Sequence, residues 1–136
     1  MRIDTERHGD VAVIALDGEL DASNYEDVIA EARRMRADGA TRLVVDLGAL
    51  TYMGSAGLVA LHASGLIYQG IEPPAGEAGW ETLTQLGADV SMTRFHEVIK
   101  LAAVPPTVDR VFSHTGMGVL FERHPDRASA IAAAGG

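Results

Sequence analysis

The first stretch of the chain has the hydrophobic pattern of two strands joined by a tight turn. The segment from Met1 to Arg7 alternates apolar and charged residues, and the run from Val11 to Leu16 is almost entirely apolar. Between them, His8-Gly9-Asp10 has the composition of a short turn. The pattern predicts a β-hairpin, so the sheet begins with an antiparallel pair of strands.

A helical spacing of apolar residues replaces this pattern from Ser23 to Asp38. The apolar positions of this segment are Tyr25, Val28, Ile29, Ala32 and Met35. They recur at intervals of three and four, which predicts an amphipathic helix. Ser23 and Glu26 have the spacing of a capping box at its start, and Gly39 suits its end because glycine readily adopts the left-handed conformation.

The next two elements are predicted to be more deeply buried. The run from Arg42 to Leu47 lacks alternation, which is typical of a central strand covered on both faces. A helix from Ser55 to about Gln69 is apolar around most of its circumference and rich in alanine and glycine. We expect this helix to pack closely on the sheet, with right-handed crossovers between parallel strands.

The segment that follows lacks a clear pattern. Gly70 to Gly79 contains Pro73-Pro74, which breaks regular elements and predicts a surface loop. Trp80 to Leu86 has the spacing of a short helix, and 88–97 has no clear period. Trp80 is open to three interpretations: a helix folded back on the core, an added interface or lid, or a cover over a small-ligand pocket.

Regular elements return in the last third of the chain. The pattern predicts a strand at Val98 to Val104 and a helix that begins at Pro106 and ends at Thr115-Gly116. A short strand at Gly118 to Phe121 and a closing helix from Pro125 to about Ala134 complete the prediction.

Composition narrows the class of protein. A chain of 136 residues, 47% of them hydrophobic, is sufficient for one domain with one core. Its net charge of -8 argues against nucleic-acid binding, which needs clustered basic residues. The chain has no cysteine, no signal-peptide pattern and no apolar stretch long enough to cross a membrane. We therefore expect a cytoplasmic protein without membrane insertion.

The sequence contains no recognisable catalytic or cofactor machinery. The five histidines are scattered and lack the paired spacing of metal ligands. Lys100 is the only lysine, so there is no phosphate-binding loop with its lysine. The stretch Gly54-Ser55-Ala56-Gly57 is not the Gly-x-Ser-x-Gly elbow of serine hydrolases. We expect a protein that is not an enzyme and that uses neither a metal nor a cofactor.

Ser55 is the most informative residue of the chain. It lies between Gly54 and Gly57, where a buried strand passes into a helix. A serine at the positive end of a helix is either a simple N-cap or a group that can be modified without refolding the chain.

Three segments, in this order, resemble the STAS domain of bacterial anti-sigma factor antagonists and of sulfate-transporter tails. They are Gly18 to Asn24, Val45 to Leu58 with its Tyr52-Met53-Gly54-Ser55-Ala56-Gly57-Leu58 turn, and Val104 to Met117. The resemblance implies an α/β fold with a mixed sheet of about five strands and about four helices. It implies a single STAS domain over 1–136, with a divergent insertion at about 70–97.

The resemblance also implies a function. In this family an anti-sigma factor that is itself a serine kinase phosphorylates the serine of an Asp-Ser-Ser-Gly or Asp-Ser-Ala-Gly turn, and the phosphorylated protein releases its partner. Ser55 matches the phosphoacceptor, Gly57 matches the glycine, and Asp21 matches an acidic residue beside that serine. The residues expected to bind the partner are Asp21, Ser23, Asn24, Gly54, Ser55, Ala56, Gly57 and Leu58.

One departure from the family pattern leaves alternatives open. Gly54 occupies the position of the family's aspartate, so either the kinase recognises a different surface or phosphorylation has been lost. In the second case the chain would be a non-phosphorylated STAS subunit of a signalling or lipid-transport assembly. Ser55 would then be a simple cap, and Asp21 only part of the turn before the first helix. The sequence leaves a homodimer open.

Overall fold

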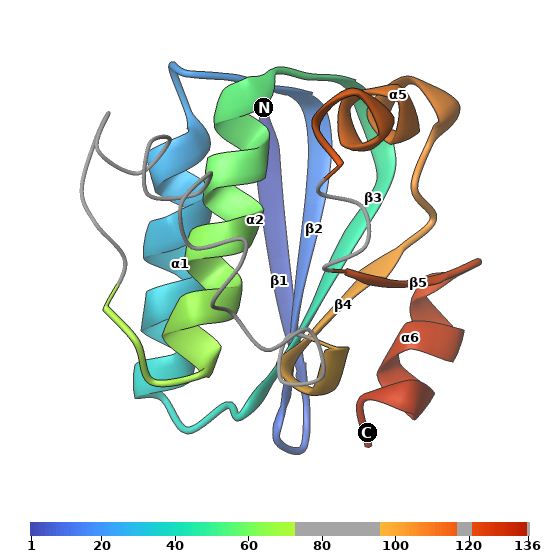
Figure 1. Cartoon of the computed structure of the whole chain (residues 1–136). Helices are drawn as coiled ribbons and strands as arrows, with labels where there is room; N and C mark the ends of the chain where they lie inside the picture. Colours follow the sequence, from blue (N-terminus) through green and yellow to red (C-terminus); the bar gives the residue numbers. More distant parts are fainter. Residues whose placement is uncertain (73–95, 117–120, 136) are drawn as a thin grey trace.

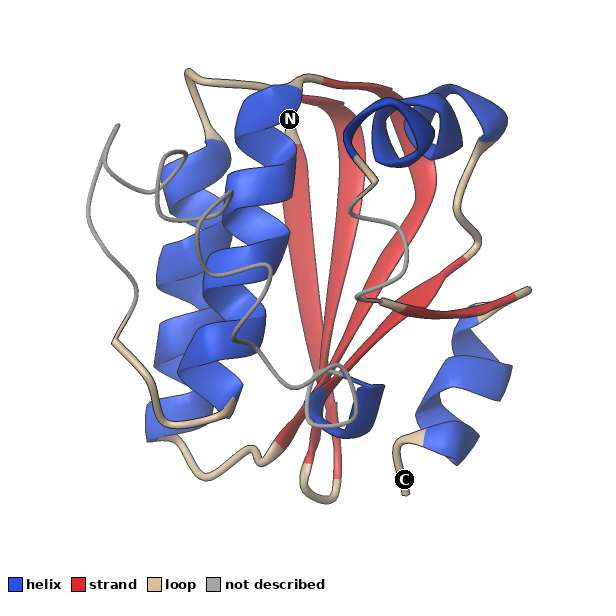
Figure 2. Cartoon of the chain, viewed as in Figure 1, coloured by secondary structure: helices blue, strands red, loops and turns tan. Residues whose placement is uncertain are grey.

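The described strands form a single five-stranded sheet. The structure is a computed structural model, and it describes residues 1–72, 96–116 and 121–135. The strands are β1 (Arg2–His8), β2 (Val11–Leu20), β3 (Arg42–Met53), β4 (Ile99–Ala102) and β5 (Glu122–His124), in the spatial order β1-β2-β3-β4-β5 (Figures 1 and 2). β1 is antiparallel to β2, and the other neighbours are parallel. The predicted hairpin and mixed sheet are confirmed.

The described helices cover both faces of this sheet. The longer ones are α1 (Tyr25–Ala37), α2 (Ser55–Tyr68), α5 (Pro106–Thr115) and α6 (Arg127–Ala133), and a short helical segment at 96–98 precedes β4. α1 and α2 lie side by side on one face, and α6 lies on the other (Figure 1). α5 contributes Val108 and Phe112 to the same core as α1 and α2.

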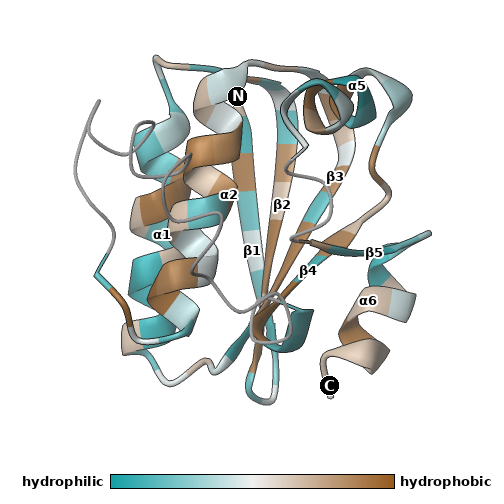
Figure 3. Cartoon of the chain, in the orientation of Figure 1, coloured by the Kyte–Doolittle hydropathy of each residue, from teal (hydrophilic) through white to brown (hydrophobic). Residues whose placement is uncertain are grey.

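The strands divide their side chains between a large core and a small one. In β2, Ile14 and Leu16 face the large core, whereas Val11 and Val13 face the small core beneath α6. This alternation follows from the twofold period of a strand, and burial on both faces explains why the run is apolar throughout. Figure 3 shows the apolar residues concentrated along the strands and α2.

β2 and β3 both extend further than the apolar runs predict. β2 continues to Leu20 and β3 to Met53, and these two residues are partners in the parallel ladder. The extensions include Asp17 and Glu19, which are polar and exposed. Sheet pairing therefore continues where one face of the sheet meets solvent, and two irregularities in the β2-β3 register accommodate it.

The start of α1 differs from the prediction. Its N-cap is Asn24, which makes no side-chain capping hydrogen bond. The capping box between Ser23 and Glu26 is wrong, because both the N–H and the hydroxyl of Ser23 donate to Asp21 Oδ1, at 2.9 and 2.5 Å. The Asp21 carboxylate is a strong competing acceptor, so Ser23 bonds to it and does not cap α1.

In the C-terminal third, the predicted elements are observed as β4, α5 and α6, whereas β5 differs from the predicted strand. Of the strand predicted at Gly118 to Phe121, only Phe121 lies within the described residues, and it precedes β5 rather than forming part of it. Its ring packs 5.8 Å from that of Phe112, so its apolar character reflects core packing. The helix predicted at Trp80 to Leu86 lies outside the described residues.

α2 is the most deeply buried helix described. Eleven of its 14 residues are buried, including His62 and Ser64. Ser64 donates its hydroxyl to the carbonyl of Ala60 at 2.7 Å. Burial lowers the pKa of His62 to about 4, so the ring is neutral at physiological pH. Even this apolar helix is too short to cross a bilayer, and no other described helix meets that requirement.

An ionic clamp fixes α6 to the sheet. Arg127 donates from Nε to Asp46 Oδ2 on β3 at 2.9 Å and from Nη1 to Glu6 Oε1 on β1 at 2.6 Å. Glu6 is also paired with His8, at 3.0 Å. The His8 hydrogen bond, followed by that of Arg127, lowers the pKa of Glu6. The clamp joins the last described helix to the edge strand β1 and to the central strand β3.

Candidate functional site

Two segments that are distant in sequence meet at the edge of the sheet where β2 and β3 end. Leu20 and Met53, the last residues of these strands, are ladder partners. The N–H of Gly54 then donates to the carbonyl of Leu20 at 2.9 Å. The loop at 21–24 and the start of α2 therefore emerge side by side, which brings together the two segments that the sequence predicted to form one site.

The loop after β2 is held in shape by its own side chains. Asp21 Oδ1 accepts the two hydrogen bonds from Ser23, and Asn24 Oδ1 accepts one from the Asp21 N–H at 3.0 Å. The amide of Asn24 also donates to the carbonyl of Glu19 at 2.8 Å. The Ser23 hydroxyl is the main cause of the lowered pKa of Asp21. The loop thus presents a fixed, ionised carboxylate.

Ser55 is exposed at the first position of α2. The N-cap is Gly54, with φ -85° and ψ 178°, and it has no side chain with which to cap the helix. The interpretation of Ser55 as a simple N-cap is therefore wrong. There is no acidic residue in the first turn, so the positive end of the helix dipole lies beside the Ser55 hydroxyl without a compensating negative charge from that turn.

Gly57 and Leu58 support the site from within the core. A β-carbon placed on Gly57 would lie 2.3 Å from Met53 Cγ and 3.1 Å from Leu20 Cδ2, so only glycine fits there. Leu58 is completely buried. Of the predicted contact residues in α2, Ser55 is exposed and Ala56 half-buried, and these two are accessible to a partner.

Tyr52 is a surface residue that the sequence prediction missed. Its side chain belongs to the end of β3 and is 52% exposed. A β-carbon placed on Gly54 would lie 3.3 Å from the Tyr52 hydroxyl oxygen, so the phenol lies beside Gly54. The prediction ended the strand at Leu47; an extension to Met53 would have placed residue 52 opposite the core-facing residue 53 and indicated its exposure.

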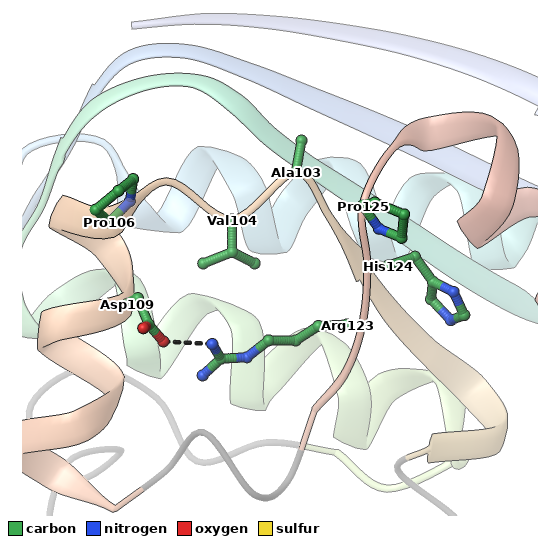
Figure 4. A pocket seen from close by; sticks show the side chains of 7 residues that line it. All are labelled: Ala103, Val104, Pro106, Asp109, Arg123, His124 and Pro125. Atoms are coloured by element: carbon green, nitrogen blue, oxygen red, sulfur yellow. Dashed lines mark hydrogen bonds and ion pairs between the residues drawn. The ribbon is translucent and has the colours of Figure 1, made fainter.

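A separate hollow lies between the end of β4, the start of α5 and β5 (Figure 4). Its volume is about 440 Å³, and its lining residues are Ala103, Val104, Pro106, Asp109, Arg123, His124 and Pro125. Arg123 is paired with Asp109 and lies over the ring of Phe112, 5.1 Å from its centre. The Asp109 carboxylate offsets the charge of Arg123. None of the predicted site residues lines the hollow.

The described ranges contain no group of three acidic or histidine side chains placed to hold a metal ion. The chemistry available at the predicted site is therefore that of an exposed hydroxyl at a helix start, a fixed carboxylate and an exposed aromatic ring. Such a set suits recognition and modification of a protein surface.

Comparisons with known proteins agree with this architecture. The model of the STAS domain family matches residues 2–64. No curated protein sequence matches the chain. Among solved structures, an anti-sigma factor antagonist from Mycobacterium paratuberculosis is 23% identical, with a TM-score of 0.69 over 99% of this chain and 94% of that one.

Two further structures have the same fold. The anti-sigma factor antagonist SpoIIAA of Bacillus, in its unphosphorylated form, is 20% identical, with a TM-score of 0.62 over 98% of this chain and 97% of that one. An anti-sigma-factor antagonist (STAS) domain protein from Planctomyces limnophilus is 15% identical, with a TM-score of 0.63 over 97% and 96% of the two chains. At these identities, the similarity establishes the fold.

Proposed function

Because the chain has the STAS fold, and its residues 2–64 match the STAS family, we propose that it is a cytoplasmic anti-sigma factor antagonist. It binds a cognate anti-sigma factor that has serine kinase activity, and so regulates transcription indirectly. Phosphorylation of Ser55 ends the binding. The protein itself is a binding module and not an enzyme.

One observation carries this proposal: Ser55 is exposed at the start of α2, beside the loop that holds Asp21. A kinase can reach a hydroxyl only when it is exposed. The same edge offers the Asp21 loop as a contact surface whose shape is fixed by hydrogen bonds before the partner arrives. Preorganisation of this kind reduces the entropy lost on binding.

The start of α2 is also suited to carry a phosphate. Amide groups at a helix N-terminus and the helix dipole stabilise an anion. The added charge of about -1.5 to -2 would therefore be accommodated within the fold while changing the surface that the partner meets. SpoIIAA, which has this fold, has been solved in both unphosphorylated and phosphorylated forms.

The test is phosphorylation and binding with the cognate anti-sigma factor. The purified protein is incubated with the kinase and ATP, and the phosphate is located by mass spectrometry. We expect one phosphate on Ser55, none on a Ser55→Ala variant, and binding that is lost on phosphorylation. Phosphate elsewhere, or equal binding by both forms, would contradict the switch.

Gly54 favours one alternative function, in which the chain is a non-phosphorylated STAS subunit of a signalling or lipid-transport assembly. It rests on the absence of the family's aspartate beside Ser55. A Ser55→Asp variant distinguishes the two: it should lose the partner if Ser55 is a switch, and retain it if the chain is a constitutive subunit.

A further inference from the structure

We propose that the Tyr52 ring is the main aromatic contact between this site and its partner. Glycine at position 54 leaves the space that this ring occupies. The inference rests on the proposed function, because it names the contact through which that binding is made.

Tyr52 is distinguished first by its exposure. Three large hydrophobic residues in the described ranges are exposed, Met1 at 40%, Ile71 at 47% and Tyr52 at 52%. Ile71 follows the opposite end of α2 from Ser55. Tyrosine is enriched among residues that dominate binding energy, because it buries a large area and loses little rotational freedom. An exposed tyrosine three residues before Ser55 is therefore well placed to contact a partner that binds there.

The backbone beneath the ring is rigid. Tyr52 is the ladder partner of Glu19, and the residues on either side of it belong to β3. Met53, the next residue, is buried in the core with 2% of its surface exposed. The strand thus presents the ring from a fixed position, as a preorganised contact requires.

The space around Gly54 explains why this position lacks a side chain. Its φ of -85° is open to any residue, so backbone conformation does not require glycine. A β-carbon there would lie 3.3 Å from the Tyr52 hydroxyl oxygen and 3.7 and 3.8 Å from two ring carbons. A side chain at position 54 would therefore crowd the Tyr52 hydroxyl and require the ring to shift. The surface beside Ser55 thus presents an aromatic ring next to a position without a side chain.

The charges around the ring indicate the chemistry of the partner. Residues 8–32 and 43–72 contain no lysine or arginine, whereas α5, which packs against β3, carries the exposed Arg110. Glu19, Glu26 and Asp27 are exposed near this edge, while Arg2 on the neighbouring strand is paired with two aspartates. The complementary surface on the anti-sigma factor is an apolar recess, which receives the ring, bordered by basic residues.

A double-mutant cycle tests the inference. The dissociation constant for the cognate anti-sigma factor is measured by calorimetry for the wild type, Tyr52→Ala, Gly54→Asp and the double variant, and thermal unfolding verifies that each is folded. We expect Tyr52→Ala to weaken binding at least about tenfold, as for a hot-spot residue. Gly54→Asp should also weaken binding, and the double variant should lose less than the product of the two single losses.

Two further variants serve as controls. Ile71→Ala removes a hydrophobic side chain of similar exposure far from Ser55 and should change affinity less than about twofold, as expected outside a hot spot. Tyr52→Phe should retain most of the affinity if the ring is the main contact. Binding by Tyr52→Ala within twofold of a wild type that does bind would overturn the proposed contact and leave the proposed function intact. A wild type that does not bind would overturn both.

Discussion

The backbone N–H of Gly54 donates a hydrogen bond to the backbone carbonyl of Leu20 at 2.9 Å. This bond continues the pairing of β2 with β3 by one step beyond the last strand residues. It sets the distance between the Asp21 loop and the start of α2 through main-chain atoms alone. Side chains on the site can therefore change, as at position 54, without altering how the two segments lie.

Gly57→Ala is expected to destabilise the protein. The new methyl group would overlap Met53 Cγ and Sδ, at 2.3 and 2.8 Å, and Met53 is itself buried. Overpacking of this kind costs about 1–3 kcal/mol. Urea unfolding measures the loss. Gly54→Ala is the matched control, because its methyl group meets only the exposed Tyr52 side chain. Equal stability of the two variants would contradict the packing described.

Asn24→Ala is expected to loosen the loop after β2. The substitution removes the hydrogen bonds from the Asp21 N–H and to the Glu19 carbonyl, each worth about 1 kcal/mol. We expect faster hydrogen exchange at the Asp21 amide, followed by NMR. Ser23→Ala, which leaves the Asn24 bonds in place, should change this exchange much less. Unchanged exchange in Asn24→Ala would show that the loop is held in another way.

Arg127→Met is expected to release α6 from the sheet. It leaves the Asp46 carboxylate, only 17% exposed, without its ionic partner, and it removes the bridge to Glu6. Loss of a partly buried pair of this kind should cost about 1–3 kcal/mol in urea unfolding. Arg34→Met removes two exposed pairs on α1 and should cost less than about 1 kcal/mol. A larger loss of stability in Arg34→Met than in Arg127→Met would contradict the role given to the Arg127 clamp.

The stability of the protein should fall as the pH is lowered from 7 to 4, with His62 as one cause. Burial lowers the pKa of His62 from 6.5 to about 4. Between these values the unfolded chain binds a proton that the folded chain excludes, so unfolding becomes easier as the pH falls. A pKa difference of this size corresponds to a loss on the order of 3 kcal/mol by pH 4.

A substitution separates His62 from other titrating groups. His62→Leu should flatten the slope of unfolding free energy against pH between 6.5 and 4, whatever its effect on stability at pH 7. His114→Gln, at an exposed position of α5, should leave the slope unchanged. The same slope in His62→Leu and the wild type would show that other groups are responsible.

The elements best predicted from sequence are those whose burial can be inferred from the apolar residues of the segment itself. The hairpin, the central run of β3 and the helix that begins near Ser55 all have apolar runs that indicate a covered surface. The Ser55 region was predicted to be the functional site because it lies between a strand and a helix and because the segment resembles the STAS family. Both sources of information are local in sequence.

What was missed depends on partners that are distant in sequence or that compete for the same atom. β2 and β3 extend to Leu20 and Met53 because they pair with one another. Ser23 bonds Asp21 rather than capping α1, because the carboxylate is the better acceptor. The exposure of Tyr52 follows from the longer β3, and its placement beside Gly54 becomes visible only in three dimensions.

The clamp at Arg127 also has a consequence for the order of events during folding. Its partners Glu6 and Asp46 lie 121 and 81 positions earlier in the chain, so the clamp closes the longest loop among the described ion pairs. Long loops are closed at a greater entropic cost and generally late. We therefore expect a chain still emerging from the ribosome to assemble the β1-β2-β3 sheet and the start of α2 before α6 is secured.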